Sequence, residues 1–384
     1  MLPVPAFEYY KKIILFASYL HLFPYCWKWD QKQRKFVIVK TLRSQILYWT
    51  QLGLLLLYQL FIASRSWKLG FDSSIPLKKK FAVQYMIFTF IGMDFNILNT
   101  YVNSEKFPLL INSFVEITER FGTTYGRPTS GGKGKEKDKV SRSISLMVIP
   151  CLLLVVANIL GALRRPESPL LLTSLAAEPR KLPLAIRLAY AGFHGYLQCL
   201  QYTMPEFNLL TVICYVDALL PMIKRLCFKT SQQKCPPESP AKTFSENEIY
   251  HFYHELSTLQ IIFNACYSYW ALGTQTFLTV FCISNIFQAG ALNNIRGILA
   301  GLFQVVLIQV IFKHMATIYE SSALTLQSWM ETSGTLFFKK FTRACKPFRV
   351  VVGSFYFADY TLILTMFSII STNSASFIVA YKDA

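Results

Sequence analysis

Several charge-free apolar runs, each about as long as a membrane-spanning helix, constrain this sequence more than any other feature. A helix needs roughly 20 apolar residues to cross the hydrocarbon core of a bilayer, which is about 30 Å thick. Hydrophobic residues form 53% of the 384 residues, and the mean hydropathy is +0.34. The sequence therefore predicts an all-α polytopic membrane protein, with transmembrane helices expected at Ser44–Ala63, Phe81–Tyr101, Ile144–Leu163, Phe207–Ile223, Leu259–Phe287, Ile298–Ile318 and Asp359–Tyr381.

The number of spans depends on one long apolar stretch, Leu188–Ile223, which Pro205 and Glu206 could divide into two. Lys and Arg concentrate on the cytosolic side of membrane proteins. With seven spans and a cytosolic N-terminus, 26 Lys and Arg lie inside and 12 lie outside; with eight spans the counts are 18 and 20. The charge distribution therefore favours seven helices, a cytosolic N-terminus and an extracellular C-terminus, with Leu188–Met204 extending the fourth helix outwards.

Composition also indicates how the parts between the spans are organised. Two stretches rich in Gly, Pro and charge, residues 123–139 and 229–242, predict disordered cytosolic loops. The second is followed by Ser245-x-x-Glu248, a capping-box signature for the start of a helix. We expect a cytosolic N-terminal segment with an interfacial helix at residues 1–43, six transmembrane helices at 44–318, a cytosolic segment at 319–358, and the last helix with a short external tail at 359–384.

The net charge of +18 does not indicate a nucleic-acid partner. The Lys and Arg residues lie in the gaps between apolar runs, where they orient spans and meet anionic lipid headgroups. The sequence shows no catalytic arrangement of Ser, His, Cys or paired carboxylates, so we predict no enzyme, no cofactor and no metal site. Asp94 and Asp217 interrupt apolar runs, which makes both candidates for a functional role. The alternative is pairing with a basic residue at the cytosolic interface, which we favour for Asp217.

The last apolar run carries a stripe of hydroxyl groups. After Asp359 it has no charge over 22 residues, roughly 33 Å as a helix. Its hydroxyls recur at i, i+4, i+7, i+11 and i+15, so they share one helix face, which consists of Thr361, Thr365, Ser368, Thr372 and Ser376. Two interpretations remain open: the stripe packs against neighbouring helices, or it lines a water-filled path formed by several copies of the helix.

Aromatic and polar residues gather on the predicted outer halves of the spans. Mostly apolar walls with a few polar groups are typical of small-molecule pockets, although plain helix packing explains any single residue equally well. The candidate ligand-binding residues are Tyr85, Phe88, Asn158, Phe193, His194, Tyr196, Tyr202, Phe303 and Gln304, with Tyr190 and Gln198 nearby.

The C-terminal 70 residues resemble the last third of the seven-span arthropod chemoreceptors, the gustatory and odorant receptor superfamily. The resemblance begins in a basic helix and continues through Gly353-Ser-Phe355 into a Thr- and Ser-rich span that includes Thr372; the basic residues are Lys339, Lys340, Arg343 and Lys346. His254-Glu255-Leu256 before the fifth span and the N-terminal LHLFPYCW are similar as well. The motif before the fifth span and the short loops favour the gustatory type. The sequence departs from that type where Asn373 follows Thr372 and where Val379 occupies the usual Gln position.

This resemblance implies a tetrameric, ligand-gated, non-selective cation channel in the plasma membrane of sensory cells. Its partners would be a small, largely apolar tastant or odorant, permeant cations and membrane lipid, and it would assemble as a homotetramer or as a heterotetramer with a co-receptor. The last helix would line the pore, with residues 319–358 in a cytosolic anchor. The gate would fall on Ser376 and Ala380 with Val379 at the polar position, or, one residue further, on Phe377 and Tyr381.

Two other classes are compatible with a helical membrane protein. A seven-helix G-protein-coupled receptor places its N-terminus outside, opposite to the charge distribution, and the sequence lacks Asp-Arg-Tyr and Asn-Pro-x-x-Tyr motifs. A secondary transporter is commonly built from repeats, and neither an even span count nor a repeat is evident. Both remain alternatives to the channel.

Overall fold

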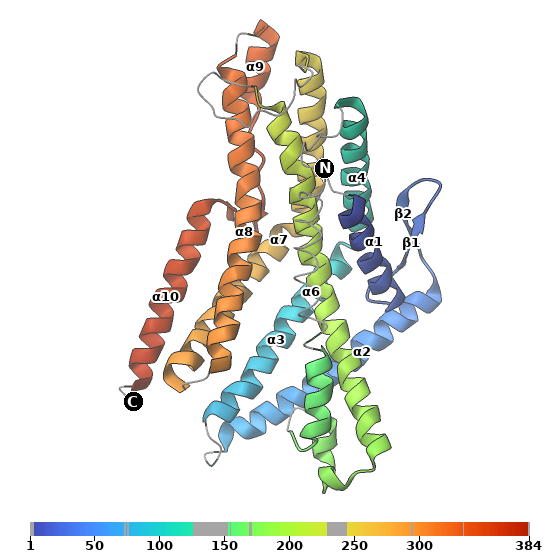
Figure 1. Cartoon of the computed structure of the whole chain (residues 1–384), viewed down its shortest axis with the longest axis vertical. Coiled ribbons are helices and arrows are strands. Elements are labelled where there is room, and N and C mark those ends of the chain that lie inside the picture. The colour runs from blue at the N-terminus through green and yellow to red at the C-terminus, as the bar shows by residue number, and fades with distance from the viewer. Residues whose placement is uncertain are drawn as a thin grey trace. The chain divides into compact units, whose positions relative to one another are not determined.

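The computed structural model describes residues 4–72, 74, 77–125, 153, 155–168, 171–228, 244–292, 295–332 and 334–382. Most of the two predicted disordered loops, and residues 144–152 of the third predicted span, therefore lie outside the described residues. The described chain is mainly helical (Figure 1). Its elements are α1 Val4–Tyr19, β1 Cys26–Asp30, β2 Lys35–Val39, α2 Leu42–Phe71, α3 Leu77–Val102, α4 Lys106–Tyr125, a helix at Val155–Arg164, η1 Leu172–Leu175, η2 Pro179–Lys181, α6 Leu184–Leu226, α7 Glu246–Leu292, α8 Ile295–Met330, α9 Leu336–Ala344, β3 Val351–Val352, β4 Tyr356–Phe357 and α10 Tyr360–Lys382.

Within these residues, 5 helices are long and apolar enough to cross a membrane. They lie in α2, α6, α7, α8 and α10, and thus coincide with the first, fourth, fifth, sixth and seventh predicted spans. The second predicted span is helical as α3, and the described end of the third is the apolar helix Val155–Arg164. The chain is therefore a multi-pass helical membrane protein.

Helix α6 is continuous over 43 residues, so Pro205 does not divide it. A proline inside a helix removes one backbone hydrogen bond, here the one to the carbonyl of Gln201. The helix continues on both sides of it, where Thr203 Oγ1 donates to the carbonyl of Cys199 at 2.7 Å and Asn208 Nδ2 donates to the carbonyl of Met204 at 3.2 Å. The expectation that one helix continues through this proline is confirmed.

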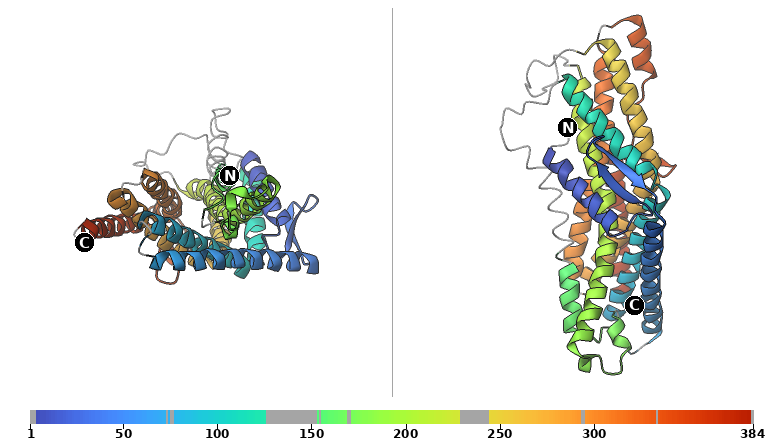
Figure 2. Two further views of the ribbon diagram at one scale, coloured as in Figure 1. Left: turned by 90° about the horizontal axis from the view of Figure 1, so that it is seen from below. Right: turned by 90° about the vertical axis from the view of Figure 1, so that its right-hand side faces the viewer.

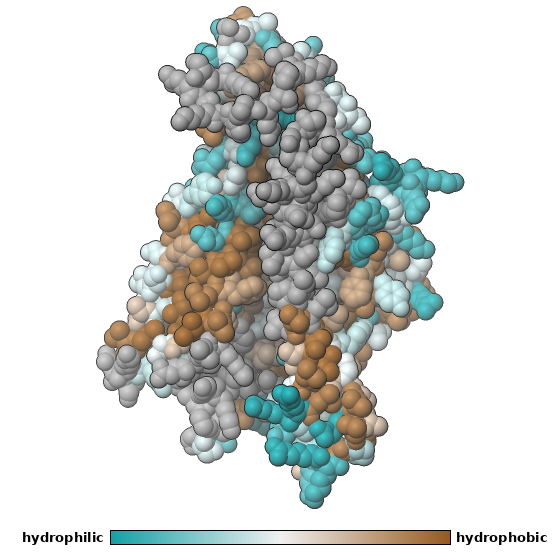
Figure 3. Space-filling view, viewed as in Figure 1, coloured by the Kyte–Doolittle hydropathy of each residue, from teal (hydrophilic) through white to brown (hydrophobic). Residues whose placement is uncertain are grey.

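The chain forms two compact units, which we describe separately. The C-terminal unit comprises Met1–Phe7, Glu105–Val140 and Leu209–Ala384. In it α7 packs along α8, and α10 packs against both (Figure 1). The rings of Tyr215 and Phe263 stack at 3.9 Å in its core. Hydrophobic side chains also cover the outer face of α8 (Figure 3), where Leu299 and Leu302 are largely exposed, as expected of a helix that meets lipid or another subunit.

A tight turn leads into α10 in the same unit. Strands β3 and β4 pair on either side of Gly353, whose φ of +63° is accessible at low cost only to glycine. The backbone N–H of Gly353 donates to the carbonyl of Ser268 on α7 at 2.7 Å, which fixes the turn against that helix. The Gly353-Ser-Phe355 motif that the sequence places before the last span is therefore a structural turn.

The second unit comprises Glu8–Ser104 and Ser141–Asn208. We call it the pocket unit, because it contains the pocket described in the next section. It contains the β1–β2 hairpin, which the sequence analysis did not predict, next to α1 (Figure 2). Trp27 stacks on Phe23 at 4.6 Å, and its backbone N–H donates to Ser18 Oγ of α1 at 2.8 Å. The amphipathic helix α4, which lies in the C-terminal unit, was likewise missed, because residues 103–143 were treated as one cytosolic connection.

Two local predictions have opposite outcomes. The capping box is confirmed: the backbone N–H of Ser245 donates to Glu248 Oε2 at 2.8 Å, and that of Glu248 donates to Ser245 Oγ at 3.3 Å. Among the described residues, no basic side chain pairs with Asp94, contrary to the suggested pairing. Asp94 instead accepts a hydrogen bond from Gln59 Nε2 at 2.8 Å, so an amide on α2 stabilises this carboxyl group inside the apolar region.

Candidate functional site

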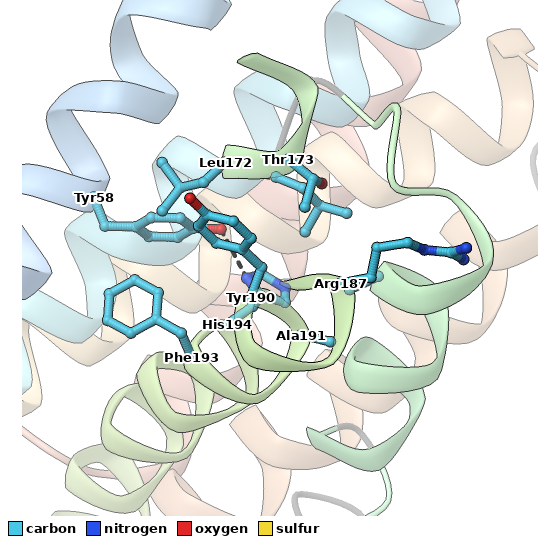
Figure 4. Close-up of a pocket in the computed structure, with 10 residues that line it drawn as sticks. Tyr58, Leu172, Thr173, Arg187, Tyr190, Ala191, Phe193 and His194 are labelled. Atoms are coloured by element: carbon cyan, nitrogen blue, oxygen red, sulfur yellow. Dashed lines mark hydrogen bonds between the residues drawn. The ribbon is translucent and has the colours of Figure 1, made fainter. Parts of the chain in front are cut away.

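A pocket lies within the pocket unit, between α2, the helix Val155–Arg164, η1 and the first part of α6 (Figure 4). The volume of the cavity is about 10 Å³, which is room for about one water molecule. The lining side chains therefore nearly fill the pocket. Its lining residues are Tyr58, Ala162, Leu171, Leu172, Thr173, Arg187, Tyr190, Ala191, Phe193 and His194.

Helix α6 supplies half of this lining because its periodicity brings separate residues to one face. Arg187, Ala191 and His194 follow i, i+4 and i+7, so they lie one above another on α6. Tyr190 and Phe193 flank this row, and Tyr58 of α2 approaches from the opposite side. Figure 4 shows the Tyr58 and His194 side chains pointing towards each other, while the Arg187 side chain extends away from them.

The connection between the helix Val155–Arg164 and α6 covers the pocket. Leu171 is buried against Ala162 and Ala191, and Thr173 donates a hydrogen bond to the carbonyl of Pro166. Arg65 Nη2 of α2 lies 3.3 Å from Ser174 Oγ and 3.4 Å from its carbonyl oxygen. These contacts hold the connection over the lining residues.

An exposed ion pair lies within this connection. Arg180 Nη2 lies 2.6 Å from Glu167 Oε1. The hydrogen bond from Arg180, assisted by its charge, holds the pKa of Glu167 below its ordinary value. Because both side chains are exposed, the pair contributes little to stability by itself and orders the connection locally.

Buried polar groups continue from the pocket along α6. Tyr58 Oη and His194 Nδ1 form a hydrogen bond of 2.7 Å, and Asn158 Nδ2 donates to Gln198 Oε1 at 3.4 Å. Gln51 Nε2 of α2 donates to Tyr196 Oη at 2.8 Å. Polar groups within an apolar helical bundle are costly unless paired, so their concentration here makes this region a candidate site.

The structure separates the predicted ligand-binding residues into groups. Phe193 and His194 line the pocket, whereas Asn158 and Tyr196 form the hydrogen bonds just described, and Tyr202 is half-buried further along α6. Phe88 is 47% exposed on α3 and does not line the pocket. The side chain of Tyr85 lies outside the described residues.

Two further predicted residues belong to the C-terminal unit. Phe303 is 55% exposed on α8, whereas Gln304 is buried and accepts a hydrogen bond from Asn285 Nδ2 at 2.9 Å. Neither lines the pocket of the other unit. A role for them in ligand binding stays a prediction.

The sequence analysis missed Tyr58, Arg187, Leu172 and Thr173. Tyr58 lies in an apolar run, and its partner His194 is 136 positions away, so no local pattern connects them. Leu172 and Thr173 lie in a connection that was treated only as external sequence. Arg187 alone offered a usable signal, since it lies on the same helical face as His194.

Helix α10 is a second candidate site because its hydroxyl stripe is exposed. Thr361, Thr365, Ser368, Thr372 and Ser376 are all exposed, so they do not pack against the described helices of their own chain. Some of them bond back to the helix: Thr365 Oγ1 donates to the carbonyl of Thr361 at 3.0 Å, and Ser376 Oγ to that of Thr372 at 2.9 Å. The buried face of α10 instead contains Leu362, Ile363, Met366, Ile370 and Ser374.

The two possible gate registers differ in their surroundings. Phe377 and Tyr381 approach the ring of Phe287 on α7, with centroid distances of 6.5 and 5.6 Å. Ser376 and Ala380 are exposed, as are Val379 and Thr372. The face that α10 leaves free therefore includes Ser376 and Ala380, while the aromatic pair is directed partly towards α7.

These features define a multi-pass helical membrane protein with a small pocket in one unit and an exposed polar face on its last helix. Its fold is similar to that of a solved insect olfactory receptor. The structure of the olfactory receptor OR5 from Machilis hrabei matches it with a TM-score of 0.61 and 11% sequence identity, over 97% of each chain. The same receptor in complex with eugenol gives a TM-score of 0.58 and 10% identity, over 98% of this chain and 99% of that chain. No family model and no curated protein sequence matches.

Proposed function

We propose that this protein is a chemosensory receptor that acts as a ligand-gated, non-selective cation channel, opened by a small, largely apolar molecule. The observation that carries the proposal is the fold match to an insect olfactory receptor over 97% of the chain. That the neighbour has been seen in complex with eugenol supports a small-molecule ligand. The motif before the fifth span and the short loops favour a gustatory-type receptor.

The proposed topology has seven transmembrane helices, a cytosolic N-terminus and an extracellular C-terminus, in the plasma membrane of a sensory cell. Helix α3 and the helix Val155–Arg164 would complete the set of spans. The positive charge on the proposed cytosolic side supports this orientation. Residues 1–43 would form the cytosolic N-terminal segment, 44–318 the first six spans, 319–358 a cytosolic anchor, and 359–384 the pore helix with its tail.

The ligand would bind in the pocket between Tyr58, Phe193 and His194. Pockets for small molecules commonly have volumes of about 300–1,000 Å³, so this pocket must widen around a ligand. A ligand opens a channel only if it binds the open state more tightly than the closed state. Displacement of η1 or rotation of Tyr190 would widen the pocket, and we propose that this change accompanies opening.

The pore would be lined by α10 from four subunits, either identical or including a co-receptor. The exposed hydroxyl stripe supports this assignment, because no described helix of the same chain covers it. Hydroxyl groups around an axis offer permeant cations partial replacement of their hydration shells. We assign the gate to Ser376 and Ala380, with Thr372 and Val379 on the same free face and Phe377 beside it.

Recording current tests this function directly. The full chain is expressed in oocytes, alone and with a chemoreceptor co-receptor, and challenged with a panel of small volatile and tastant molecules that includes eugenol. We expect an agonist-evoked cation current that Ser376→Arg abolishes while the protein remains at the cell surface. Absence of current for every ligand in both settings would contradict the channel.

An epitope tag at the N-terminus separates the channel from a G-protein-coupled receptor. The channel topology predicts that antibody labels the tag only after the cells are permeabilised. A tag at the C-terminus serves as the control, because it should be labelled on intact cells. Labelling of the N-terminal tag on intact cells would favour the receptor class that signals through G proteins.

A further inference from the structure

The pocket presents hydrogen-bond donors that have no described acceptor. His194 is 8% exposed and lines the pocket, and its Nδ1 bonds with Tyr58 Oη at 2.7 Å. A phenol is a stronger acid than a neutral imidazole, so the Tyr58 hydroxyl donates and Nδ1 accepts. The neutral ring then carries its proton on Nε2. Among the described residues, none accepts a hydrogen bond from that atom.

Two other side chains of α6, those of Arg187 and Gln198, also have a hydrogen-bond donor without a described acceptor. Arg187 donates through Nη2 to the carbonyl of Leu163, but its buried Nε has no described partner. Gln198, one turn from His194 and 2% exposed, accepts from Asn158 through Oε1 while its Nε2 is unpaired. Arg187 also forms no ion pair with a described carboxylate, since Glu167 pairs with Arg180.

The rest of the lining is apolar or already bonded. Phe193, Ala191 and Leu172 offer a hydrophobic surface, and the Thr173 hydroxyl donates to Pro166. The pocket thus combines an apolar wall with donors on one helix face. A hydrocarbon occupant would displace water from such a donor and leave it unpaired, whereas an occupant with an oxygen acceptor would satisfy it.

We propose that the pocket selects small apolar molecules that carry one hydrogen-bond-accepting carbonyl oxygen, and that His194 Nε2 determines this preference by donating to that oxygen. This inference rests on the proposed function and specifies the ligand class of the same site. Tyr58 is a positioning residue, because its hydroxyl fixes the tautomer that leaves Nε2 as the donor. Arg187 also lines the pocket, and Gln198 lies one turn beyond His194 on α6.

A matched pair of ligands tests this preference. Acetophenone and α-methylstyrene have nearly the same shape, but only the first has a carbonyl oxygen. Binding is measured as the ligand-induced rise in the melting temperature of the purified full-length protein, and potency as agonist-evoked current in cells. One neutral hydrogen bond changes affinity about tenfold, so we expect the wild-type protein to prefer acetophenone by about that factor in both assays.

Three variants assign the effect to His194. His194→Phe removes the donor but keeps an aromatic ring, and it should reduce the preference to within about twofold. His194→Gln keeps an N–H donor and should retain most of the preference, which also shows that the site tolerates substitution. His251→Phe, the same change at an exposed histidine of α7, is the matched control and should behave like the wild type.

Each outcome is decisive. Equal binding of the two ligands by the wild-type protein, or a preference that persists in His194→Phe, would overturn the inference. Preferential binding of acetophenone without any agonist-evoked current would uphold the donor site and count against the channel. Current evoked equally by both ligands would uphold the channel and refute the role of His194.

Discussion

Two serines on opposite faces of α10 make the strongest test of the pore assignment. Ser376 is exposed, and its hydroxyl bonds only to the carbonyl of Thr372 in the same helix. Ser374 is 3% exposed, and its buried hydroxyl has no described partner. Replacing either residue with cysteine should be tolerated, because Ser376→Cys loses a bond worth about 1 kcal/mol and Ser374→Cys removes an unpaired hydroxyl.

A positively charged methanethiosulfonate reagent then reports which face meets the permeating ions. After reaction, the thiol introduced at position 376 would carry a positive charge in each of four subunits. At about 6 Å from the pore axis in water, each charge raises the energy of a cation by roughly 0.7 kcal/mol, or about 2.8 kcal/mol for four. That energy corresponds to an occupancy roughly 100-fold lower, so the agonist-evoked current should fall nearly to zero.

The matched position should respond differently. A thiol at position 374 becomes accessible only through local opening of the packed helix, so its reaction should be about 100-fold slower than that at position 376. The wild-type protein provides the reference, because the chain has 9 native cysteines. Equal reaction rates at the two positions, or an unchanged current after complete modification of the Ser376→Cys variant, would refute a pore lined by this face.

Three further predictions concern the scaffold. The buried Asn99 Nδ2 donates to Asn208 Oδ1 at 3.2 Å, and Asn208→Leu removes this acceptor. The substitution should lower the free energy of unfolding by about 2 kcal/mol, which would be measured as a lower melting temperature in detergent. Ser245→Ala removes the helix cap and should cost about 1 kcal/mol; faster hydrogen exchange confined to the first turn of α7 would confirm this, and unchanged exchange would contradict it. Because Arg180 lowers the pKa of Glu167, the pair stabilises the fold above the ordinary value of 4.5 and is lost as the pH falls through the lowered value. The stability difference between wild type and Glu167→Gln should therefore be constant above about pH 4.5 and vanish in stronger acid.

The helices of the membrane region were predictable because lipid leaves few options for an apolar chain. A run of about twenty apolar residues must satisfy its backbone hydrogen bonds internally, so α2, α7, α8 and α10 follow from composition and length. The capping box at Ser245 was equally local. The hairpin around Trp27 escaped prediction, since its strands are short and its stability depends on contacts with Phe23 and α1.

The candidate pocket was only partly predictable. His194 and Phe193 were identified because polar and aromatic residues are conspicuous on an apolar helix. Tyr58 was not, because a tyrosine in an apolar run looks like any other core residue until the fold brings it to His194. Phe303, which the sequence analysis also placed among the ligand-binding residues, is exposed on α8. Periodicity gives the position of a residue around its helix, but not which neighbour that side of the helix contacts.

The sequence by itself determined that this protein is a multi-pass helical membrane protein, because hydrophobic length and charge act locally and leave a direct record in the chain. It also determined that one face of the last helix is a row of hydroxyl groups. Only the tertiary structure decided that this row is left uncovered by the chain's own described helices, while Ser374 and Met366 face inwards. That choice depends on how α10 rotates against α7 and α8, and packing between distant segments, rather than any local pattern, sets the rotation.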